Sequence, residues 1–266
     1  MKNGNEYFET LFPEMSDSLL GGSALATMQD TLLNTVFDQS KKMIGNMVEF
    51  KELMMMYNCA MKTVKTKFDV LNTEFKVRHQ RNPIKFIDTR LKRTTSILEK
   101  MERIDIPFSL ENVEEHINDV AGIRVICSYL DDIYVIAKAL TAQNDVTLIA
   151  RKDYIANPKP NGYRSMHLII SVPVFFSEQI KHLKVEVQIR TIAMDFWASL
   201  EHQLKYKQEN PNGEEIAAEL KECSEIISDT DNRMLKIRKQ IEVSSGEPTD
   251  EELLFEKLKK FDMPME

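Results

Sequence analysis

The chain has 266 residues, a net charge of −7, 42% hydrophobic residues and 29% charged residues. This composition is typical of a soluble globular protein, and the length allows one large domain or one domain with helical additions. No apolar run approaches the roughly 20 residues of a spanning helix, and residues 1–10 lack the pattern of a signal peptide. The acidic charge argues against bulk attraction to nucleic acid or anionic lipid, so any anion site has to be local.

The three cysteines, Cys59, Cys127 and Cys223, are widely spaced and form no C-x-x-C pair. An odd number without such spacing favours neither a disulfide framework nor a zinc site. We therefore expect reduced thiols and a cytoplasmic location.

The N-terminal part predicts a leader followed by a long helix. Residues 1–45 contain Gly21, Gly22 and several Ser and Thr, which favours a loosely ordered leader with room for one short helix. Residues 46–79 are rich in Met, Leu, Lys and Glu and contain no Gly or Pro. They predict a long helix that ends before Asn82-Pro83.

The middle of the chain predicts an α/β core. Residues 86–91 are a candidate strand, and Thr94 or Thr95 can cap a helix that runs to Arg103. Residues 123–129 form an apolar run of strand length, and the apolar positions of residues 131–142 repeat at helical spacing. Residues 146–154, 165–172 and 184–190 read as further strands. We expect a sheet of four or five strands.

The C-terminal part predicts helices. Residues 192–207 and 214–242 are two candidates, and Thr249 with Glu252 offers a capping box for a last helix that ends near Phe261. The apolar stripe of this last helix needs a partner, either the same subunit or a second copy of the chain. The predicted divisions are residues 1–45, 46–210 and 211–266: a leader, the core domain with its N-terminal helix, and C-terminal helices for oligomerisation.

Polar side chains alternate with apolar ones along residues 184–190. Glu186, Gln188 and Arg190 share one face of this strand, and the valines and isoleucine between them share the other. Taken alone, this pattern fits a solvated sheet face equally well. Ser165 and His167 share a face of the neighbouring strand, so that two polar rows together favour a pocket floor.

The loop of residues 152–164 contains two prolines, the turn pair Asn161-Gly162, three cations and two tyrosines. Rigid cations suit phosphate, and a tyrosine ring suits stacking on a base. The alternative is an ordinary polar loop in which Tyr163 covers the core.

Asp119 precedes the strand predicted for residues 123–129, which contains Arg124. If Asp119 and Glu186 converge, they form an oxygen-ligand pair for Mg²⁺, which takes one or two carboxylates and completes its shell with substrate phosphates and water. The alternative is an ion pair between Asp119 and Arg124 that buttresses the strand. A basic cluster lies upstream, at Arg90, Lys92, Arg93, Ser96 and Lys100. Such a cluster is usually a solvated helix face, but here it is a local exception in an acidic chain.

Four long blocks resemble the synthetase domain of the RelA/SpoT homologues in its stand-alone form, the small alarmone synthetases. The blocks are RLKRTTSILEK (90–100), NDVAGIRVICSYLDDIY (118–134), KDYIANPKPNGYRSMH (152–167) and VEVQIRTIAMDFWASLEHQLKYK (185–207). The resemblance implies a mixed sheet of about five strands in a nucleotidyltransferase-like core with helices at both ends. The bifunctional relatives add a hydrolase built on a His-Asp metal motif. This chain contains no His-Asp pair, so synthesis without hydrolysis is expected.

The resemblance implies a GTP diphosphokinase that moves the β,γ-pyrophosphate of ATP to the 3′-hydroxyl of GTP or GDP, giving (p)ppGpp and AMP in the stringent response. Glu186, Asp119, Arg90 and Lys92 would be catalytic, with Glu186 as base and Asp119 and Glu186 as Mg²⁺ ligands. The implied ATP-binding residues are Arg90, Lys92, Ser96, Lys100 and Arg124. The implied GTP- or GDP-binding residues are Lys152, Lys159, Tyr163, His167, Gln188, Arg190 and Asp195.

Asp195 departs from the pattern, because some relatives have asparagine there. A carboxylate can accept both N1–H and the amine of guanine, so the change keeps or sharpens guanine preference. The resemblance also favours a homotetramer. Three alternative hypotheses of function remain. They are a catalytically silent nucleotide-binding regulatory module, a nucleotidyltransferase that releases pyrophosphate, and a helical scaffold or RNA-binding protein. The acidic charge counts against the last, although single-stranded RNA stays open as a partner.

Overall fold

The computed structural model describes residues 22–78, 81–206 and 213–244. The chain divides into two compact units, Met1–Glu52 and Leu53–Glu266, and the second contains the sheet. The predicted last helix, near residues 249–261, lies outside the described residues, and the predicted divisions at residues 45 and 210 stay predictions. No helix in the described ranges has both the length and the apolarity that crossing a membrane requires. Cys59, Cys127 and Cys223 are free thiols.

The first described element is α2 (Gly22–Arg78), which begins well before the predicted residue 46. The expectation of a leader with one short helix is therefore wrong for residues 22–45. This segment contains no proline and, after Gly22, only one glycine, Gly45, so nothing in it stops a helix. From Leu53 onward, α2 buries apolar side chains at intervals of three or four residues, which is the stripe that packs on a core. They include Tyr57, Ala60, Val64, Phe68 and Leu71.

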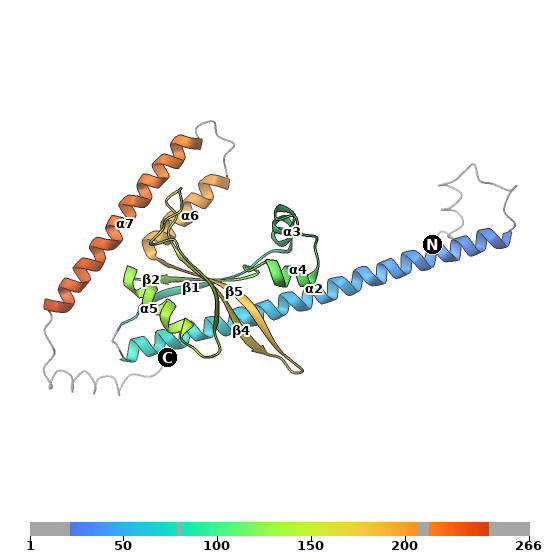
Figure 1. Cartoon of the computed structure of the whole chain (residues 1–266), viewed down its shortest axis with the longest axis horizontal. Helices are drawn as coiled ribbons and strands as arrows, with labels where there is room; N and C mark the ends of the chain where they lie inside the picture. Colours follow the sequence, from blue (N-terminus) through green and yellow to red (C-terminus); the bar gives the residue numbers. More distant parts are fainter. Residues whose placement is uncertain (1–21, 79–80, 207–212, 245–266) are drawn as a thin grey trace. The chain divides into compact units, whose positions relative to one another are not determined.

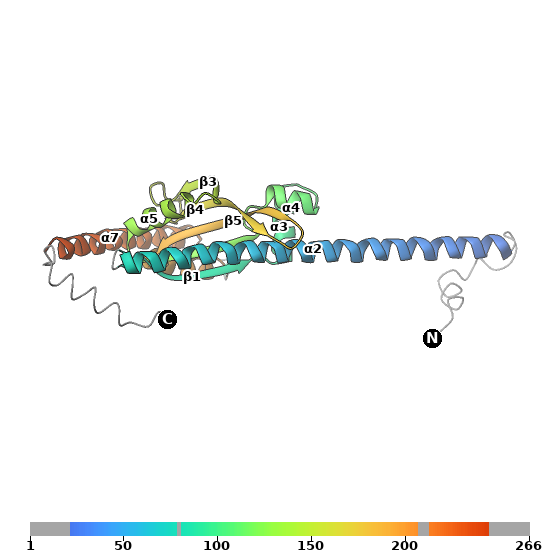
Figure 2. The same ribbon diagram turned by 90° about the horizontal axis from the view of Figure 1, so that it is seen from below.

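In the part of the chain that the structure describes, the sheet has five strands in the order β1-β2-β5-β4-β3. These are β1 (Ile84–Leu91), β2 (Ala121–Cys127), β3 (Thr147–Asp153), β4 (Met166–Phe175) and β5 (Ile180–Thr191). The pair β2 and β5 is parallel and the other three pairs are antiparallel, so the predicted mixed sheet is confirmed. Figure 2 shows the part of α2 that follows Leu53 running alongside the sheet.

The strand register aligns polar residues across the whole sheet. Directly paired residues have their side chains on the same face. One transverse row across all five strands is Asp88, Arg124, Gln188, His167 and Lys152. A neighbouring row places Gly122 between Arg90 and Glu186. On the opposite face, Val185, Val187 and Ile189 are buried, as the alternation along β5 predicts.

The described residues form five further helices, which are α3 (Thr94–Arg103), α4 (Leu110–His116), α5 (Leu130–Thr141), α6 (Ile192–Tyr206) and α7 (Gly213–Ser244). Figure 1 shows α6 and α7 at one end of the sheet and α3 and α4 at the other. The sequence pattern missed α4, whose N-terminus is capped by the Ser109 hydroxyl, which accepts a hydrogen bond from Asn112 N at 3.1 Å. The predicted threonine cap of α3 is wrong, because Arg93 occupies that position without a side-chain cap.

The strands β4 and β5 extend as a ribbon beyond their neighbours, as far as the pair Phe175 and Ile180. The tip side chains are exposed, and Phe176 N donates to Gln179 O at 2.8 Å to close the turn. Lys181, which lies opposite Val174 next to the tip, pairs with Glu114. Lys184 Nζ, nearer the base, donates to Glu115 O, so both contacts tie the ribbon to α4.

Asp132, at the start of α5, joins three parts of the core. Its side chain is 2% exposed. It accepts a hydrogen bond from Tyr129 N at 3.2 Å and pairs with Arg81, which precedes β1. Arg238 of α7 lies 3.9 Å from the same carboxylate and 2.6 Å from Asp131. Burial raises the pKa of Asp132, although Arg81 opposes this shift.

We expect Asp132→Ala to lower the free energy of unfolding by about 3 kcal/mol, because it removes a helix cap and the buried carboxylate that pairs with Arg81. Urea unfolding at pH 7 measures this change. Asp69→Ala is the control, because Asp69 forms only an exposed pair with Lys65 within α2 and should cost less than about 0.5 kcal/mol. Equal small losses in both variants would contradict the anchoring role of Asp132.

Candidate active site

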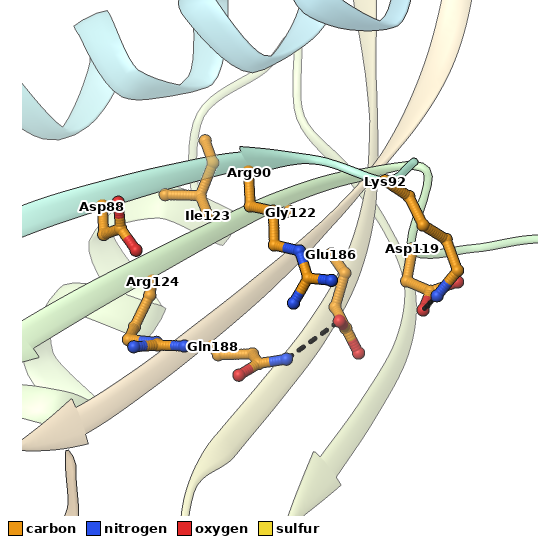
Figure 3. Close-up of a pocket in the computed structure, with 9 residues that line it drawn as sticks. All are labelled: Asp88, Arg90, Lys92, Asp119, Gly122, Ile123, Arg124, Glu186 and Gln188. Carbon is orange, nitrogen blue, oxygen red and sulfur yellow. Dashed lines mark hydrogen bonds and ion pairs between the residues drawn. The ribbon is translucent and has the colours of Figure 1, made fainter. Parts of the chain in front are cut away.

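A pocket of about 150 Å³ lies on the polar face of the sheet. Strands β1, β2 and β5 provide most of its lining, and the segment before β2 adds Asp119 (Figure 3). The lining residues are Asp88, Arg90, Lys92, Asp119, Gly122, Ile123, Arg124, Glu186 and Gln188. Because Gly122 has no side chain, it leaves open space between Arg90 and Glu186 on the flanking strands. Asp119 and Glu186 thus line the same pocket, which is the condition that the hypothesis of a carboxylate pair required.

Asp119 is held by two lysines at the edge of this pocket. Lys92 Nζ donates to one carboxylate oxygen at 2.8 Å and Lys100 Nζ donates to the other at 2.6 Å. Burial opposes ionisation of Asp119, but the hydrogen bonds and charges of the two lysines outweigh it and hold its pKa below the usual range. The alternative ion pair between Asp119 and Arg124 is wrong, because Arg124 pairs with Asp195 at 3.3 Å instead.

Glu186 projects from the centre of β5, between the pocket and β4. Its Oε1 lies 3.2 Å from His167 Nδ1, and its Oε2 accepts a hydrogen bond from Gln188 Nε2 at 3.0 Å. Burial opposes ionisation here too, but His167 and Gln188 outweigh it and lower the pKa of Glu186. The nearby charge of Asp119 opposes this lowering. Both carboxylates are therefore ionised at neutral pH.

A second group of side chains lies on the β4 side of Glu186, around Tyr163. The Tyr163 hydroxyl lies 2.8 Å from His167 Nε2 and accepts a hydrogen bond from Arg190 Nη2 at 2.5 Å. Arg190 Nη2 also donates to Gln188 Oε1 at 2.7 Å. A closed ring of hydrogen bonds thus connects Tyr163, His167, Glu186, Gln188 and Arg190. Each of these side chains fixes the orientation of the next.

Aromatic rings and a cation stand beside this ring of hydrogen bonds. The rings of Tyr154, Tyr163 and His167 meet edge to face, with centroids 5.2–6.1 Å apart. Lys159 Nζ lies 4.7 Å from the centroid of Tyr154 and 4.8 Å from that of Tyr163. The loop of residues 152–164 therefore joins the polar strand face, and the alternative of an ordinary polar loop is wrong.

Asp195, in the first turn of α6, links the two groups. Its Oδ1 lies 3.1 Å from Arg190 Nη1 and 3.3 Å from Arg124 Nη1. One carboxylate oxygen is thus shared between a guanidinium of the pocket and a guanidinium of the Tyr163 group. Among the described residues, Arg124 Nε is buried without a hydrogen-bond partner.

Two of the predicted residues, Lys152 and Ser96, do not line the pocket. Lys152 is exposed on β3, in the same transverse row as His167, and Ser96 is half-buried in α3. Sequence reasoning missed Asp88, which lines the pocket two residues before Arg90 and so on the same face of β1. It also left Tyr154 without a role. Spacing alone could have found Asp88, since strand alternation pairs it with Arg90.

Comparison with known proteins agrees with this geometry. Residues 89–211 match the region found in RelA and SpoT proteins. GTP pyrophosphokinase YwaC of Bacillus subtilis (strain 168) is 42% identical over 196 residues, covering 74% of this chain and 93% of that relative. GTP pyrophosphokinase YjbM of the same strain is 37% identical over 194 residues, covering 73% of this chain and 90% of YjbM.

Solved structures give the same result. The small alarmone synthetase 2 from Bacillus subtilis matches with a TM-score of 0.65 at 42% identity, covering 72% of this chain and 98% of that structure. The small alarmone synthetase 1 from Bacillus subtilis, bound to its product pppGpp, matches with a TM-score of 0.67 at 37% identity, covering 73% and 98%. Fold and site thus define a protein of the RelA/SpoT synthetase class. The chain belongs to the small alarmone synthetases, a family of GTP pyrophosphokinases.

We expect Asp119→Asn to reduce stability by about 1 kcal/mol at pH 7, because it removes two partly exposed charge-assisted hydrogen bonds. The folded pKa of Asp119 lies below its unfolded value, near 3.9. The carboxylate therefore stabilises the fold above that value and loses its contribution as pH falls through the lower, folded pKa.

Unfolding free energies of wild type and variant, measured from pH 7 to pH 3, test this expectation. The difference should be present at pH 7 and shrink below about pH 4. Asp229→Asn, in an exposed pair on α7, should track the wild type throughout. A difference that is independent of pH would show that the lysines do not lower the Asp119 pKa.

Proposed function

We propose that this chain transfers the β,γ-pyrophosphate of ATP to the ribose 3′-hydroxyl of GTP or GDP, producing (p)ppGpp and AMP. The observation that carries the proposal is the position of Glu186, an ionised carboxylate that both lines the basic pocket and belongs to the Tyr163 group. A base in this position can accept the proton of a hydroxyl group bound on the Tyr163 side. That hydroxyl can then attack a phosphate bound on the pocket side. The names of the relatives YwaC and YjbM support the same reaction.

The pocket between β1 and β2 is the proposed ATP side. Arg90 and Arg124 line it, and their planar guanidinium groups suit stacking on adenine. Lys92, Lys100 and Ser96 are the proposed phosphate contacts. The ammonium groups of Lys92 and Lys100 already lie beside Asp119 at the edge of the pocket. A solved structure of the small alarmone synthetase 1 from Bacillus subtilis bound to AMPCPP, 32% identical with a TM-score of 0.61, supports a nucleotide at this type of site.

The Tyr163 group is the proposed acceptor side. Stacking on the Tyr163 ring would hold guanine, and Asp195 would accept its N–H groups. Lys152, Lys159 and His167 would contact the acceptor phosphates, with Gln188 and Arg190 lining the same side. Guanine contact at Asp195 competes with the two arginines that now share its oxygen.

Asp119 and Glu186 fit a Mg²⁺ ion. Both carboxylates are ionised and line one pocket, and Mg²⁺ commonly uses one or two carboxylates together with substrate phosphates and water. Within the described residues no group of three or more His, Cys, Asp or Glu could hold a metal ion, so this pair would need substrate phosphates and water to complete the shell. When bound, Mg²⁺ would neutralise phosphate charge in the reaction.

The protein's own groups account for the remaining steps. The acceptor hydroxyl attacks the β-phosphorus of ATP in line with the leaving AMP, and Glu186 accepts the hydroxyl proton. The arginines and lysines of the pocket neutralise the charge that builds up on phosphate oxygens. His167 and Gln188 keep the Glu186 carboxylate in place for this transfer.

The direct test incubates the protein with Mg²⁺, ATP and either GTP or GDP, and resolves the nucleotides by anion exchange. We expect AMP together with a more highly charged guanosine nucleotide. Release of pyrophosphate would identify a nucleotidyltransferase instead, and binding without turnover would identify a silent regulatory module.

We expect Glu186→Gln and Asp119→Asn each to reduce kcat at least 100-fold while circular dichroism stays unchanged. Glu178→Gln is the matched control, because Glu178 is an exposed carboxylate at the turn of the β4–β5 ribbon. It should keep wild-type kcat. Full activity in either site variant would remove that residue from the proposed metal or base role.

We also propose that the chain forms a homotetramer in the cytoplasm. Exposed apolar side chains repeat along one side of α6, and others lie along α7. They are Ile192, Phe196, Leu200 and Leu204 on α6, and Ile226, Met234, Ile237 and Ile241 on α7. Such stripes support self-association.

Multi-angle light scattering should give a mass four times that of the chain. The double substitution Met234→Glu and Ile237→Glu should lower this mass. A wild-type mass of one chain would contradict the proposal.

A further inference from the structure

We propose that α7 positions the acceptor side of the active site, with Ser224 and Asp231 as positioning residues for the nucleotide that Tyr163 and Arg190 would bind. This inference rests on the proposed function. Ser224, Asp231 and Arg238 are seven residues apart, about two helical turns, and so lie on one face of α7. Arg238 anchors that face to α5 through Asp131 and Asp132.

Ser224 contacts the turn that carries Tyr163. Its side chain is buried, and its hydroxyl donates a hydrogen bond to Gly162 O. Gly162 has a φ of +88°, and a Cβ atom there would lie 2.7 Å from Ser224 Cβ and 3.3 Å from Lys221 Cα. Only glycine allows both this backbone conformation and so close an approach of the helix. The turn is therefore pressed directly against α7.

The same turn fixes the start of the Tyr163 side chain. Gly162 N donates to Lys159 O at 2.8 Å, and Lys159 N donates to Tyr163 O at 3.1 Å. Tyr163 N donates to Asn161 Oδ1 at 3.2 Å, while Asn161 Nδ2 donates to Glu201 of α6 at 3.0 Å. A shift of Gly162 would thus move the Tyr163 backbone.

Asp231 holds Thr191, the residue that follows Arg190. Its Oδ2 accepts a hydrogen bond from Thr191 Oγ1 at 2.6 Å, and the same hydroxyl accepts one from Met194 N at 3.1 Å, in the first turn of α6. Thr191 follows Arg190 directly in β5 and is buried. Asp231 therefore fixes the backbone at the point where the strand becomes a helix.

The two residues that α7 positions, Tyr163 and Arg190, are hydrogen-bonded to each other in the site. Arg190 Nη2 donates to the Tyr163 hydroxyl at 2.5 Å, and the Arg190 guanidinium lies 5.1 Å from the centroid of the Tyr163 ring. Ser224 holds the backbone beside Tyr163, and Asp231 holds the backbone beside Arg190. Among the described residues, the hydrogen bonds and ion pairs that α7 forms with other elements go to none of the residues that line the ATP-side pocket. The effect of α7 should be selective for the acceptor.

Steady-state kinetics with Ser224→Ala and Asp231→Ala test the proposal. Each should raise the KM for GTP or GDP roughly 3- to 10-fold, the range expected for one lost hydrogen bond, and leave the KM for ATP within about twofold. Asp231→Asn keeps an acceptor oxygen for Thr191 and should restore the wild-type KM. Thr230→Ala is the control, because Thr230 is exposed on α7 and its hydroxyl contacts only Ile226 O.

A double-mutant cycle separates positioning from general loss of stability. Because Ser224 acts through Tyr163, Ser224→Ala should have no further effect on the acceptor KM in a Tyr163→Ala background. Additive effects, or an equal rise of the KM for ATP, would overturn the proposal. Unfolding midpoints of the variants provide the stability reference.

Calorimetric binding of GDP in the presence of AMPCPP measures the same selectivity without turnover. If the wild type forms no AMP, the proposed function fails, and the Kd for GDP still tests the role of α7. A Kd for GDP that Ser224→Ala and Asp231→Ala leave unchanged would overturn the proposal. An active wild type whose variants keep their acceptor KM would overturn the role of α7 alone.

Discussion

The register between β2 and β5 is the constraint on which the site depends. It pairs Gly122 with Glu186 and Arg124 with Gln188, and thereby places the pocket residues of two strands on one face. Side chains alternate along a strand, so a slip by one residue would turn Glu186 into the core and expose its valine neighbours. The buried valines and isoleucine of β5 oppose that slip. Core packing on one face therefore fixes the chemistry on the other.

The two carboxylates of the site are kept ionised by different means. Asp119 is paired with two ammonium groups that point across the pocket edge, whereas Glu186 relies on an imidazole and an amide within the sheet face. A carboxylate paired with lysines can exchange them for a metal ion and phosphates when substrate arrives. A carboxylate held by fixed neighbours keeps its position throughout. This difference agrees with the proposal that both carboxylates bind the metal ion and that Glu186 is also the base.

Much of the sheet was predictable because strand alternation leaves a direct trace in the sequence. The polar face of β5 follows from the alternation of Glu186, Gln188 and Arg190 with apolar residues, and four motif blocks predicted the family. Contacts between distant segments leave no such trace. The lysine partners of Asp119 and the α7 contacts of Gly162 and Thr191 depend on tertiary packing. The helix α4 was missed because it has only seven residues, about two turns.

The ribbon formed by the ends of β4 and β5 carries none of the site residues beyond its base. Its turn, between Phe175 and Ile180, is exposed and closed by a backbone hydrogen bond, while Lys181 and Lys184 tie the ribbon behind the turn to α4. Exposed turns of this kind are where proteins accept inserted sequence most readily. The ribbon tip is therefore a natural place for a fluorophore or an affinity tag, from which a probe could report on the enzyme without entering the catalytic face of the sheet.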